Sequence, residues 1–521
     1  MKSLSTIFFI TIFSVAAFGQ DGTLDSTFGI NGKIMIPFLA YPPAGCTSEA
    51  LQPDGKILIA GYDTSLSCIL MRLNSDGSPD YSFGNNSYTT LHFAYENVIQ
   101  NIKLQADGKI VAAISYGSGF YNYRFAVARY LTNGVLDSSF ANDGVDTTDF
   151  GGTGSRTSSL AIQPDGKIVA VGYRYTADPD VVLARYNTNG SLDTSFNTTG
   201  KVITALGPRG DFSQAIALQY DGKILVTGGT YTSDTTGDYF VMRYLANGAL
   251  DNSFGVNGIV QGTYGGYWEH ANGIVEQPDG KIVFAGSTNI SPNNFNWTLM
   301  RLLPDGTPDN SFGTNGLVIT DFADSLDIAA GICLQPNGKI IEAGNATITN
   351  EQSDVAVLRY NTDGSFDSTF GTNGIVTTDF SGGDDGGSRV LLQSDGRIVV
   401  CGNSRSQADN IYSFIVCRYL NDEGIHGNDF VSDLNLGSNC SFYPNPLHQA
   451  ETLSYTLTKN ELLTISLYDV NGKQIRNFIS NEQRTAGTHK EMLSIGELTS
   501  GNYFLTISNG SQKMTVKMVK Q

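Results

Sequence analysis

The chain has 521 residues, a formal net charge of -18 and 59 glycines, and only 16% of its residues are charged. This length is too great for one ordinary compact core, so several domains or a repeat array are expected. The acidic balance argues against nucleic acid and anionic membranes as partners, because both attract basic patches. Abundant glycine without a long 3.6-residue apolar period predicts an all-β protein.

The first 19 residues have the layout of a secretory signal peptide. Lys2 precedes the apolar run IFFITIFSVAAF, and Ala17 and Gly19 occupy the small −3 and −1 positions of a cleavage site. The run is too short to span a bilayer, and no later segment approaches about 20 apolar residues. We therefore expect an exported protein without a transmembrane segment.

Three markers repeat seven times between residues 20 and 420. They are a turn of the type Leu-Gln-Pro-Asp-Gly-Lys, an arginine that ends an alternating apolar run, and the phrase Leu-Asp-x-Ser-Phe. Because three independent markers give the same count, the array has seven units. The arginines are Arg72, Arg129, Arg185, Arg243, Arg301, Arg359 and Arg418.

Each unit contains four strand-like segments. The first ends in the Asp-Gly turn, which is the strongest short hairpin signal. The second, such as KILIAG at 56–61, is the continuous apolar run of a strand buried on both faces. The third alternates, and the fourth is more polar, as an outer strand should be. Seven such units predict a seven-bladed β-propeller, with a β-solenoid as the structural alternative.

The chain begins with a piece of a repeat that has no preceding strands. In six units an aspartate follows the arginine by eight residues, but His426 stands at this distance from Arg418. The missing aspartate is Asp25, within the segment Asp21–Phe38. We therefore expect this segment to supply the outer strand of the seventh blade, with Asp25 paired to Arg418, so that the ring is closed. The alternative makes KIMIPF at 33–38 the inner strand of the first blade, which its polarity disfavours.

The repeat LQPDGKIVVAG, followed by FAVARYNxDGSLDxSFGxNG, resembles the delta-60 repeat family over residues 20–420. That resemblance implies a β-propeller. It implies no defined activity, because members of the family share none.

After Leu420 the composition changes. Residues 421–440 are polar and glycine-rich, so a linker is expected there. Residues 441–521 alternate as strands do, with an Asn-Gly turn at Asn471–Gly472, and predict a small β-sandwich.

The same C-terminal segment resembles the sorting domain of type IX secretion substrates (Por type, type A). The matching phrases are Tyr443–Pro446, Asp469–Lys473, Ser500–Leu505 and Lys513–Lys520. The resemblance implies the type IX secretion machinery of a Gram-negative bacterium as a partner. It also implies cleavage of the tail, followed by release or attachment at the outer-membrane surface.

Six cysteines are too few and too irregularly placed for a disulfide framework. Export would still permit one bridge. Cys401 and Cys417 fall on consecutive strands of one hairpin, so they are the predicted disulfide.

No catalytic or metal-binding motif is present among the patterns HExxH, Walker loop, nucleophile elbow and Cys-x-x-Cys. Loops such as the one with Asn361, Asp363 and Asp367 space oxygen atoms as a Ca²⁺ site does. A turn closed by side-chain hydrogen bonds and an Arg–Asp pair explains the same spacing better, because every unit repeats it. We therefore expect no cofactor.

Function is expected where the repeat varies, in the loop between the second and third strands and in the stretch leading into the first. Both connections emerge on one face of a four-stranded meander, which makes that face the candidate binding surface. The fifth unit contains both tryptophans, and Tyr267, Trp268, His270 and Trp297 are its candidate ligand-binding residues. Packing between blades is the alternative role for these aromatic side chains.

The sequence therefore predicts a monomeric, exported binding propeller. It does not define the ligand, for which a glycan and a cell-surface molecule are the candidates. An extracellular carbohydrate-active enzyme is one alternative and would need paired acids, for which Glu269, Asp384 and Asp385 are the candidates. A structural adhesion protein is the other.

Overall fold

The computed structural model describes residues 21–421 and 441–520, apart from gaps at 39–43, 64, 94, 119–120, 234–235, 292–293, 323–326, 350–351, 381, 394, 444–449, 458–459, 470–472, 486, 495–497, 499–500 and 510–512. The predicted signal peptide, the linker after Asn421 and the Asn471–Gly472 turn lie outside the described residues. No helix in the described part of the chain has the length and hydropathy of a membrane span.

Twenty-eight strands form seven four-stranded antiparallel sheets, the blades of a propeller. From the inner to the outer strand, blades 1 to 4 contain β2 (Gly45–Leu51), β3 (Ile57–Tyr62), β4 (Cys68–Leu73) and β5 (Tyr88–Leu91); β6 (Glu96–Leu104), β7 (Ile110–Gly117), β8 (Tyr123–Tyr130) and β9 (Val145–Thr148); β10 (Gly154–Ile162), β11 (Ile168–Tyr175), β12 (Asp180–Tyr186) and β13 (Lys201–Thr204); and β14 (Asp211–Leu218), β15 (Ile224–Tyr231), β16 (Gly237–Tyr244) and β17 (Ile259–Gly262). Blades 5 to 7 contain β18 (Glu269–Glu276), β19 (Ile282–Ser291), β20 (Asn294–Leu302) and β21 (Leu317–Thr320); β22 (Ile328–Leu334), β23 (Ile340–Thr349), β24 (Gln352–Tyr360) and β25 (Ile375–Thr378); and β26 (Asp384–Leu392), β27 (Ile398–Arg405), β28 (Tyr412–Tyr419) and β1 (Lys33–Phe38).

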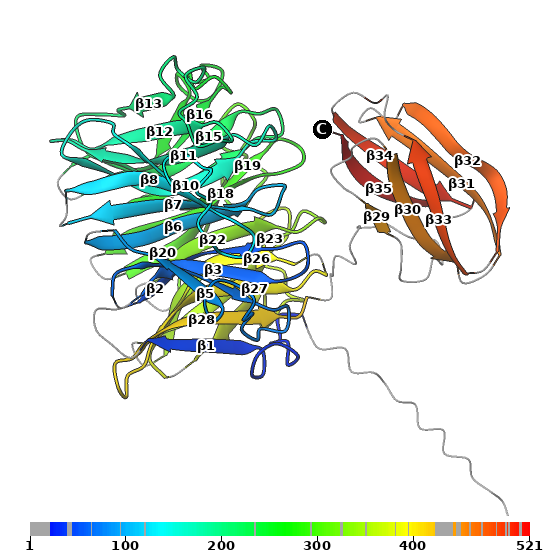
Figure 1. The fold of residues 1–521 in the computed structure, drawn as a ribbon, viewed down its shortest axis with the longest axis horizontal. Coiled ribbons are helices and arrows are strands. Elements are labelled where there is room, and N and C mark those ends of the chain that lie inside the picture. The colour runs from blue at the N-terminus through cyan, green and yellow to red at the C-terminus, as the bar shows by residue number, and fades with distance from the viewer. Residues whose placement is uncertain are drawn as a thin grey trace, which may run out of the picture.

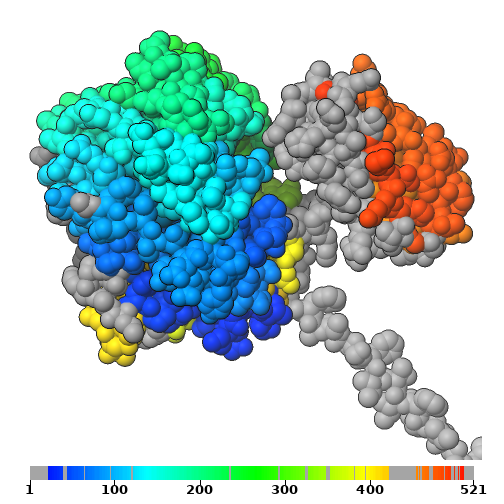
Figure 2. Space-filling model, viewed as in Figure 1, coloured from blue at the N-terminus to red at the C-terminus, as the bar shows by residue number. Residues whose placement is uncertain are grey.

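The ring is closed by the N-terminal strand. β1 pairs with β28 over six residues, from Lys33 opposite Cys417 to Phe38 opposite Tyr412. Figure 1 shows this dark-blue strand beside gold β28, and in Figure 2 dark-blue atoms lie next to yellow atoms of the seventh blade. The predicted closure is therefore confirmed, and the assignment of KIMIPF to the inner strand of the first blade is wrong.

Each inner strand carries a β-bulge at the same place, and these strands surround a central channel. A bulge bends its strand and increases the local twist, so seven bulges give the inner wall a regular curvature. The unpaired residues are Thr47, Gln100, Ser158, Gln214, Asn272, Ala330 and Ser388.

The sequence phrases that recur in each repeat form one ion-pair network per blade. In blade 1, Asp80 accepts from Arg72 at 2.7 Å and from Lys56 at 2.9 Å. The Arg72 guanidinium lies 4.6 Å from the centre of the Phe83 ring and donates to the carbonyl of Thr132 in blade 2 at 2.6 Å. These groups therefore link each blade to the next and have a structural role.

The same network spans the two ends of the ring. Arg418 Nη2 lies 2.8 Å from Asp25 Oδ2, and Arg397 Nε lies 2.9 Å from the same oxygen. Phe28 lies under the Arg418 guanidinium at 4.4 Å. Arg418 also donates to the carbonyl of Ser75 in blade 1 at 2.5 Å. The N-terminal segment therefore completes the seventh network as well as the seventh sheet.

Asp137, in the network of blade 2, is expected to stabilise the fold in a pH-dependent way. Burial alone raises its pKa, but hydrogen bonds from Ser139 and the charge of Arg129 outweigh burial and lower the pKa to about 2. A carboxylate with a lowered pKa stabilises the fold above its unfolded pKa and loses this effect as pH falls toward the folded value. We expect Asp137→Asn to reduce the free energy of unfolding by about 2 kcal/mol near pH 6 and by less near pH 2.5. Urea unfolding at both pH values measures the difference, and an equal loss at both would contradict this role.

The predicted disulfide between Cys401 and Cys417 is wrong. Cys401 lies opposite Val416 and Cys417 opposite Val400, so the two cysteines are one residue out of register. Side chains one residue apart point to opposite faces of a sheet. Cys401 is accordingly buried against blade 1 and Cys417 against blade 6, and both thiols are free.

The C-terminal region contains two sheets with one core. The first has the order β29 (Ser441–Tyr443), β30 (Ala450–Leu457), β33 (Gly487–Ser494), and the second has the order β32 (Gln474–Arg484), β31 (Glu461–Asp469), β34 (Gly501–Ser508), β35 (Lys513–Lys520). Buried Leu453 and Tyr455 from the first sheet share a core with Leu463, Ile465 and Leu505 from the second. Apolar side chains alternate along these strands, as packing of two sheets face to face requires.

Candidate functional site

The two faces of the propeller differ in how regular they are. On one face, the Asp-Gly turns and the ion-pair networks repeat in each blade; we call this the turn face. On the other, loops between second and third strands bond to the connections that enter the first strands, as when Asn97 N donates to Leu66 O at 2.8 Å and Gly237 N to Tyr267 O at 2.7 Å. We call this the variable face. It combines irregular loops with a rigid scaffold, as binding surfaces commonly do.

Six aromatic rings form a continuous belt across blades 2 to 5 on the variable face. Consecutive ring centres are 4.8–5.5 Å apart, mostly edge to face, which is a favourable geometry for aromatic pairs. In order, the rings of this aromatic belt are Tyr121, Tyr175, Tyr173, Phe212, Tyr231 and Trp268.

Exposure varies along the aromatic belt. Tyr121 at one end is 67% exposed and Tyr231 is 36% exposed, whereas Tyr175 is buried at 8%. Trp268 is half-buried. The buried rings fix the positions of the exposed ones, so the belt offers a row of preorganised apolar surfaces.

Arg156 adds a positive charge beside the aromatic belt. Its guanidinium lies 4.4 Å from the centre of the Tyr123 ring, a cation–π contact. Burial, together with a hydrogen bond to Glu96, raises the pKa of Tyr123 to about 12. The Tyr123 hydroxyl is therefore a neutral donor at physiological pH.

Three of the four residues singled out in the fifth unit lie at or beside the aromatic belt. Tyr267 is 52% exposed and directly precedes Trp268. His270 is half-buried, and burial lowers its pKa, so its imidazole is neutral near pH 7. Its Nδ1 atom is buried without a hydrogen-bond partner.

Trp297 is the exception, and its assignment as a ligand-binding residue is contradicted. Its side chain is 0% exposed in the core between blades 5 and 6. The indole Nε1 donates to the Asn345 carbonyl at 3.0 Å, and the ring meets Phe322 edge to face. Packing between blades is therefore the role of this tryptophan.

Loops with Ca²⁺-like spacing use their oxygens for turn hydrogen bonds. Asp363 Oδ1 accepts from the backbone and the hydroxyl of Ser365 at 2.9 and 2.6 Å. Asn361 donates its side-chain amide to Ser365 Oγ at 3.0 Å, and Asp367 pairs with Arg359. These contacts match the turn explanation of the spacing.

Of the three acids suggested for catalysis, Asp384 is exposed, and the other two hold loops in place. Glu269 is 1% exposed and accepts from the backbone N–H groups of Tyr264 and Gly266, both at 2.7 Å. Asp385 accepts from the N–H of Phe380 at 2.6 Å in the same position of blade 7. A buried acid at the start of an inner strand thus braces the connection from the preceding blade.

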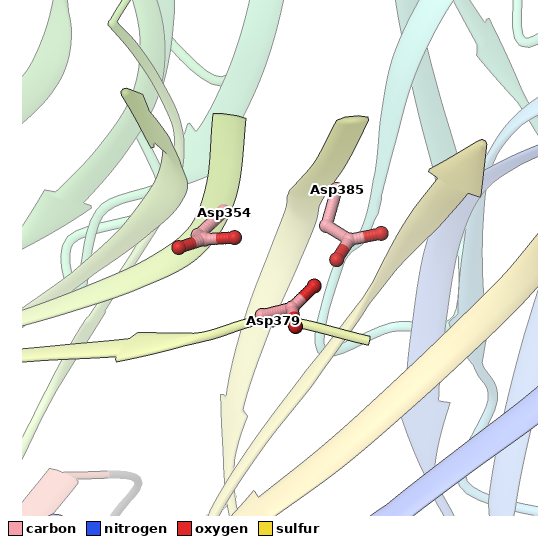
Figure 3. Close-up of side chains that lie close together, drawn as sticks. All are labelled: Asp354, Asp379 and Asp385. Carbon is pink, nitrogen blue, oxygen red and sulfur yellow. The ribbon is translucent and has the colours of Figure 1, made fainter. Parts of the chain in front are cut away.

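Asp385 also belongs to a cluster of three carboxylates on the variable face between blades 6 and 7. One oxygen each from Asp354, Asp379 and Asp385 lies within 4.8 Å of the other two. Figure 3 shows the three side chains close together. Burial, with an added contribution from the charges of the other two, raises the pKa of Asp385 to about 6. Three neighbouring carboxylates can share a proton or face a cation, but Asp385 Oδ2 has the bracing role seen in blade 5.

The comparisons with known proteins identify both parts of the chain. A β-propeller domain of unknown function (DUF5122) matches residues 52–83, 105–140, 163–196, 219–254, 277–312, 335–370 and 393–422. A secretion system C-terminal sorting domain matches residues 441–521. A comparison with curated proteins found no match.

Solved structures of similar shape are distant. They include an ulvan lyase (10% identity, 76% of this chain and 94% of that chain, TM-score 0.42) and a protein of unknown function from Dyadobacter fermentans (11%, 74% and 100%, 0.40). A third is the periplasmic gluconolactonase of Pseudomonas aeruginosa (11%, 73% and 95%, 0.39). Similarity at this level carries no argument about function.

A closed seven-bladed ring followed by a sorting segment defines an exported β-propeller protein. The chain is a DUF5122 β-propeller protein with a secretion system C-terminal sorting domain, as its repeats and its last 81 residues predict. The sorting domain indicates export by type IX secretion, and therefore a secreted or cell-surface location and handling by that machinery.

Proposed function

We propose that this exported propeller binds glycans through the aromatic belt on its variable face. The observation that carries the proposal is the row of six rings, which extends from Tyr121 to Trp268 over four blades. Pyranose rings present apolar C–H faces that stack on aromatic side chains, while their hydroxyl groups need polar partners nearby.

Polar groups beside the aromatic belt supply such partners. Asp180 and Arg174 pair at 2.8 Å near Tyr173, and Arg156 lies against Tyr123. A row of apolar platforms with polar groups at its edges suits an extended polysaccharide better than a compact ligand. Export to the cell exterior would bring this face to such polymers.

We expect Trp268→Ala to weaken glycan binding by roughly tenfold or more, because loss of one stacking ring removes about 1–3 kcal/mol. A glycan array with the full chain identifies a bound polysaccharide, and isothermal titration then compares the variants. Tyr231→Ala tests a second ring of the aromatic belt.

Tyr81→Ala is the matched control, because Tyr81 is 72% exposed but lies in a loop of the turn face. It should leave the affinity unchanged. The proposal would be refuted if Tyr81→Ala and Trp268→Ala lost the same amount of glycan affinity, or if no arrayed glycan bound.

A further inference from the structure

The central channel breaks the sevenfold pattern at three positions in adjacent blades. Counting from the bulge of each inner strand, the second residue is aliphatic in six blades but is Glu49 in blade 1. The third residue is Lys103 in blade 2, where the other blades have alanine, valine, cysteine or leucine. The first is Arg389 in blade 7, where the others have serine, asparagine, alanine or glycine. Closing the ring brings these three blades together.

These three side chains line a cavity of about 420 Å³ in the channel, bounded by the inner strands of all seven blades. Its opposite wall includes the apolar Ile216 and Ile332, and also Glu276, whose carboxylate accepts from the side-chain amide of Gln219 and the backbone N–H of Tyr220. The cavity extends to Tyr220 in the Asp-Gly turn of blade 4, so it reaches the turn face. It is therefore separate from the aromatic belt.

Two cations line this cavity. Lys103 is exposed, and Arg389 is half-buried, with its Nη1 donating to the carbonyl of Ala330 at 2.8 Å. Enclosure by the channel wall lowers the pKa of Lys103, and the charge of Arg389 lowers it further. Like charges held close together are costly unless an anion lies between them.

Glu49 is 3% exposed, and neither of its carboxyl oxygens has a hydrogen-bond partner. Burial raises the pKa of Glu49 well above its usual range, and it faces the thiols of Cys46 on β2 and Cys401 on β27 and the cations Arg389 on β26 and Lys103 on β6. A protonated Glu49 has no negative charge with which to balance the cations.

We propose that the channel binds a small organic carboxylate. The carboxylate group lies between Lys103 and Arg389, and the hydrocarbon part packs on Ile216 and Ile332. A space of 420 Å³ admits a molecule of about ten to twenty non-hydrogen atoms. This site is independent of glycan binding, because it opens on the opposite face.

Isothermal titration of the full chain tests the proposal with acetate, hexanoate, benzoate and phenylacetate, each compared with its neutral amide. At least one carboxylate should bind roughly tenfold or more tightly than its amide. Lys103→Met should weaken that binding by about tenfold or more, whereas Lys103→Arg, which keeps the charge, should retain it. Glu49→Gln should retain binding at neutral pH.

Arg124→Met is the matched control, because Arg124 is an exposed cation of blade 2 on β8, outside the cavity. The Arg124→Met variant should bind the carboxylates with the same affinity as the native chain. The proposal is overturned if none of the four carboxylates binds more tightly than its amide. It is also overturned if Arg124→Met or Lys103→Arg weakens binding as much as Lys103→Met, or if sulfate binds as tightly as the best carboxylate.

Discussion

Deletion of residues 21–38 is expected to open the ring and to leave a chain that aggregates. The deletion removes all six residues of β1 that pair with β28, so β28 becomes an exposed edge strand. It also removes Phe28, which is 0% exposed, and the carboxylate of Asp25, which leaves Arg418 buried without its anion. Loss of one partner of a buried ion pair alone costs about 3–5 kcal/mol.

Light scattering coupled to size-exclusion chromatography and thermal unfolding measure these effects. Asp25→Asn is the graded control, since it keeps the strand and removes only the charge, and it should remain monomeric with a lower melting temperature. A deletion variant that is monomeric and melts within a few degrees of the full chain would contradict the role of the N-terminal strand.

The second large effect is expected at Glu342, a fully buried acid in the core between blades 5 and 6. Other blades have aliphatic or aromatic side chains there, such as Val226 and Val400. Burial raises the pKa of Glu342 to about 8, against a smaller lowering by the hydroxyl of Tyr360, which donates to Oε2 at 3.0 Å. Its other oxygen has no hydrogen-bond partner.

An acid with a raised folded-state pKa contributes its stability below the unfolded pKa and loses it as pH rises through the folded value. Because of Glu342, the free energy of unfolding of the native chain should therefore fall by on the order of 4 kcal/mol between pH 4.5 and pH 8. Glu342→Gln should remove this decline, so the variant is more stable than the native chain near pH 8.5. Urea unfolding across this pH range is the measurement.

Asp384→Asn is the control for Glu342→Gln, because the side chain of Asp384 is 55% exposed. It should leave the pH dependence as in the native chain. If Glu342→Gln lost stability with rising pH as steeply as the native chain, the buried acid would not be the cause.

The sequence predicted the architecture well because the residues of its repeat markers form the ion-pair network of each blade. The absence of an aspartate after Arg418 and its presence at Asp25 were enough to predict closure, since each arginine needs one buried anion. The register of Cys401 and Cys417 could not be predicted in the same way. A shift of one residue reverses the face on which a side chain lies.

The aromatic belt was predictable only in part. Trp268 and Trp297 belong to the same unit, but one lies at the variable face and the other between two blades, and spacing in the chain does not distinguish them. Phe212 and Tyr231 join the belt only through the arrangement of the blades. Glu49 and Glu342, by contrast, had a signal in the sequence, since each replaces an apolar residue when the units are aligned.

Hydrogen–deuterium exchange of the full chain, with and without a polysaccharide identified on the array, tests whether the variable face is the binding surface. Glycan binding should slow exchange in peptides that contain Tyr173–Tyr175 and Tyr267–Trp268, and should leave the turn-face peptide around Tyr81 unchanged. Protection of the Tyr81 peptide without protection of the aromatic belt would contradict the assignment.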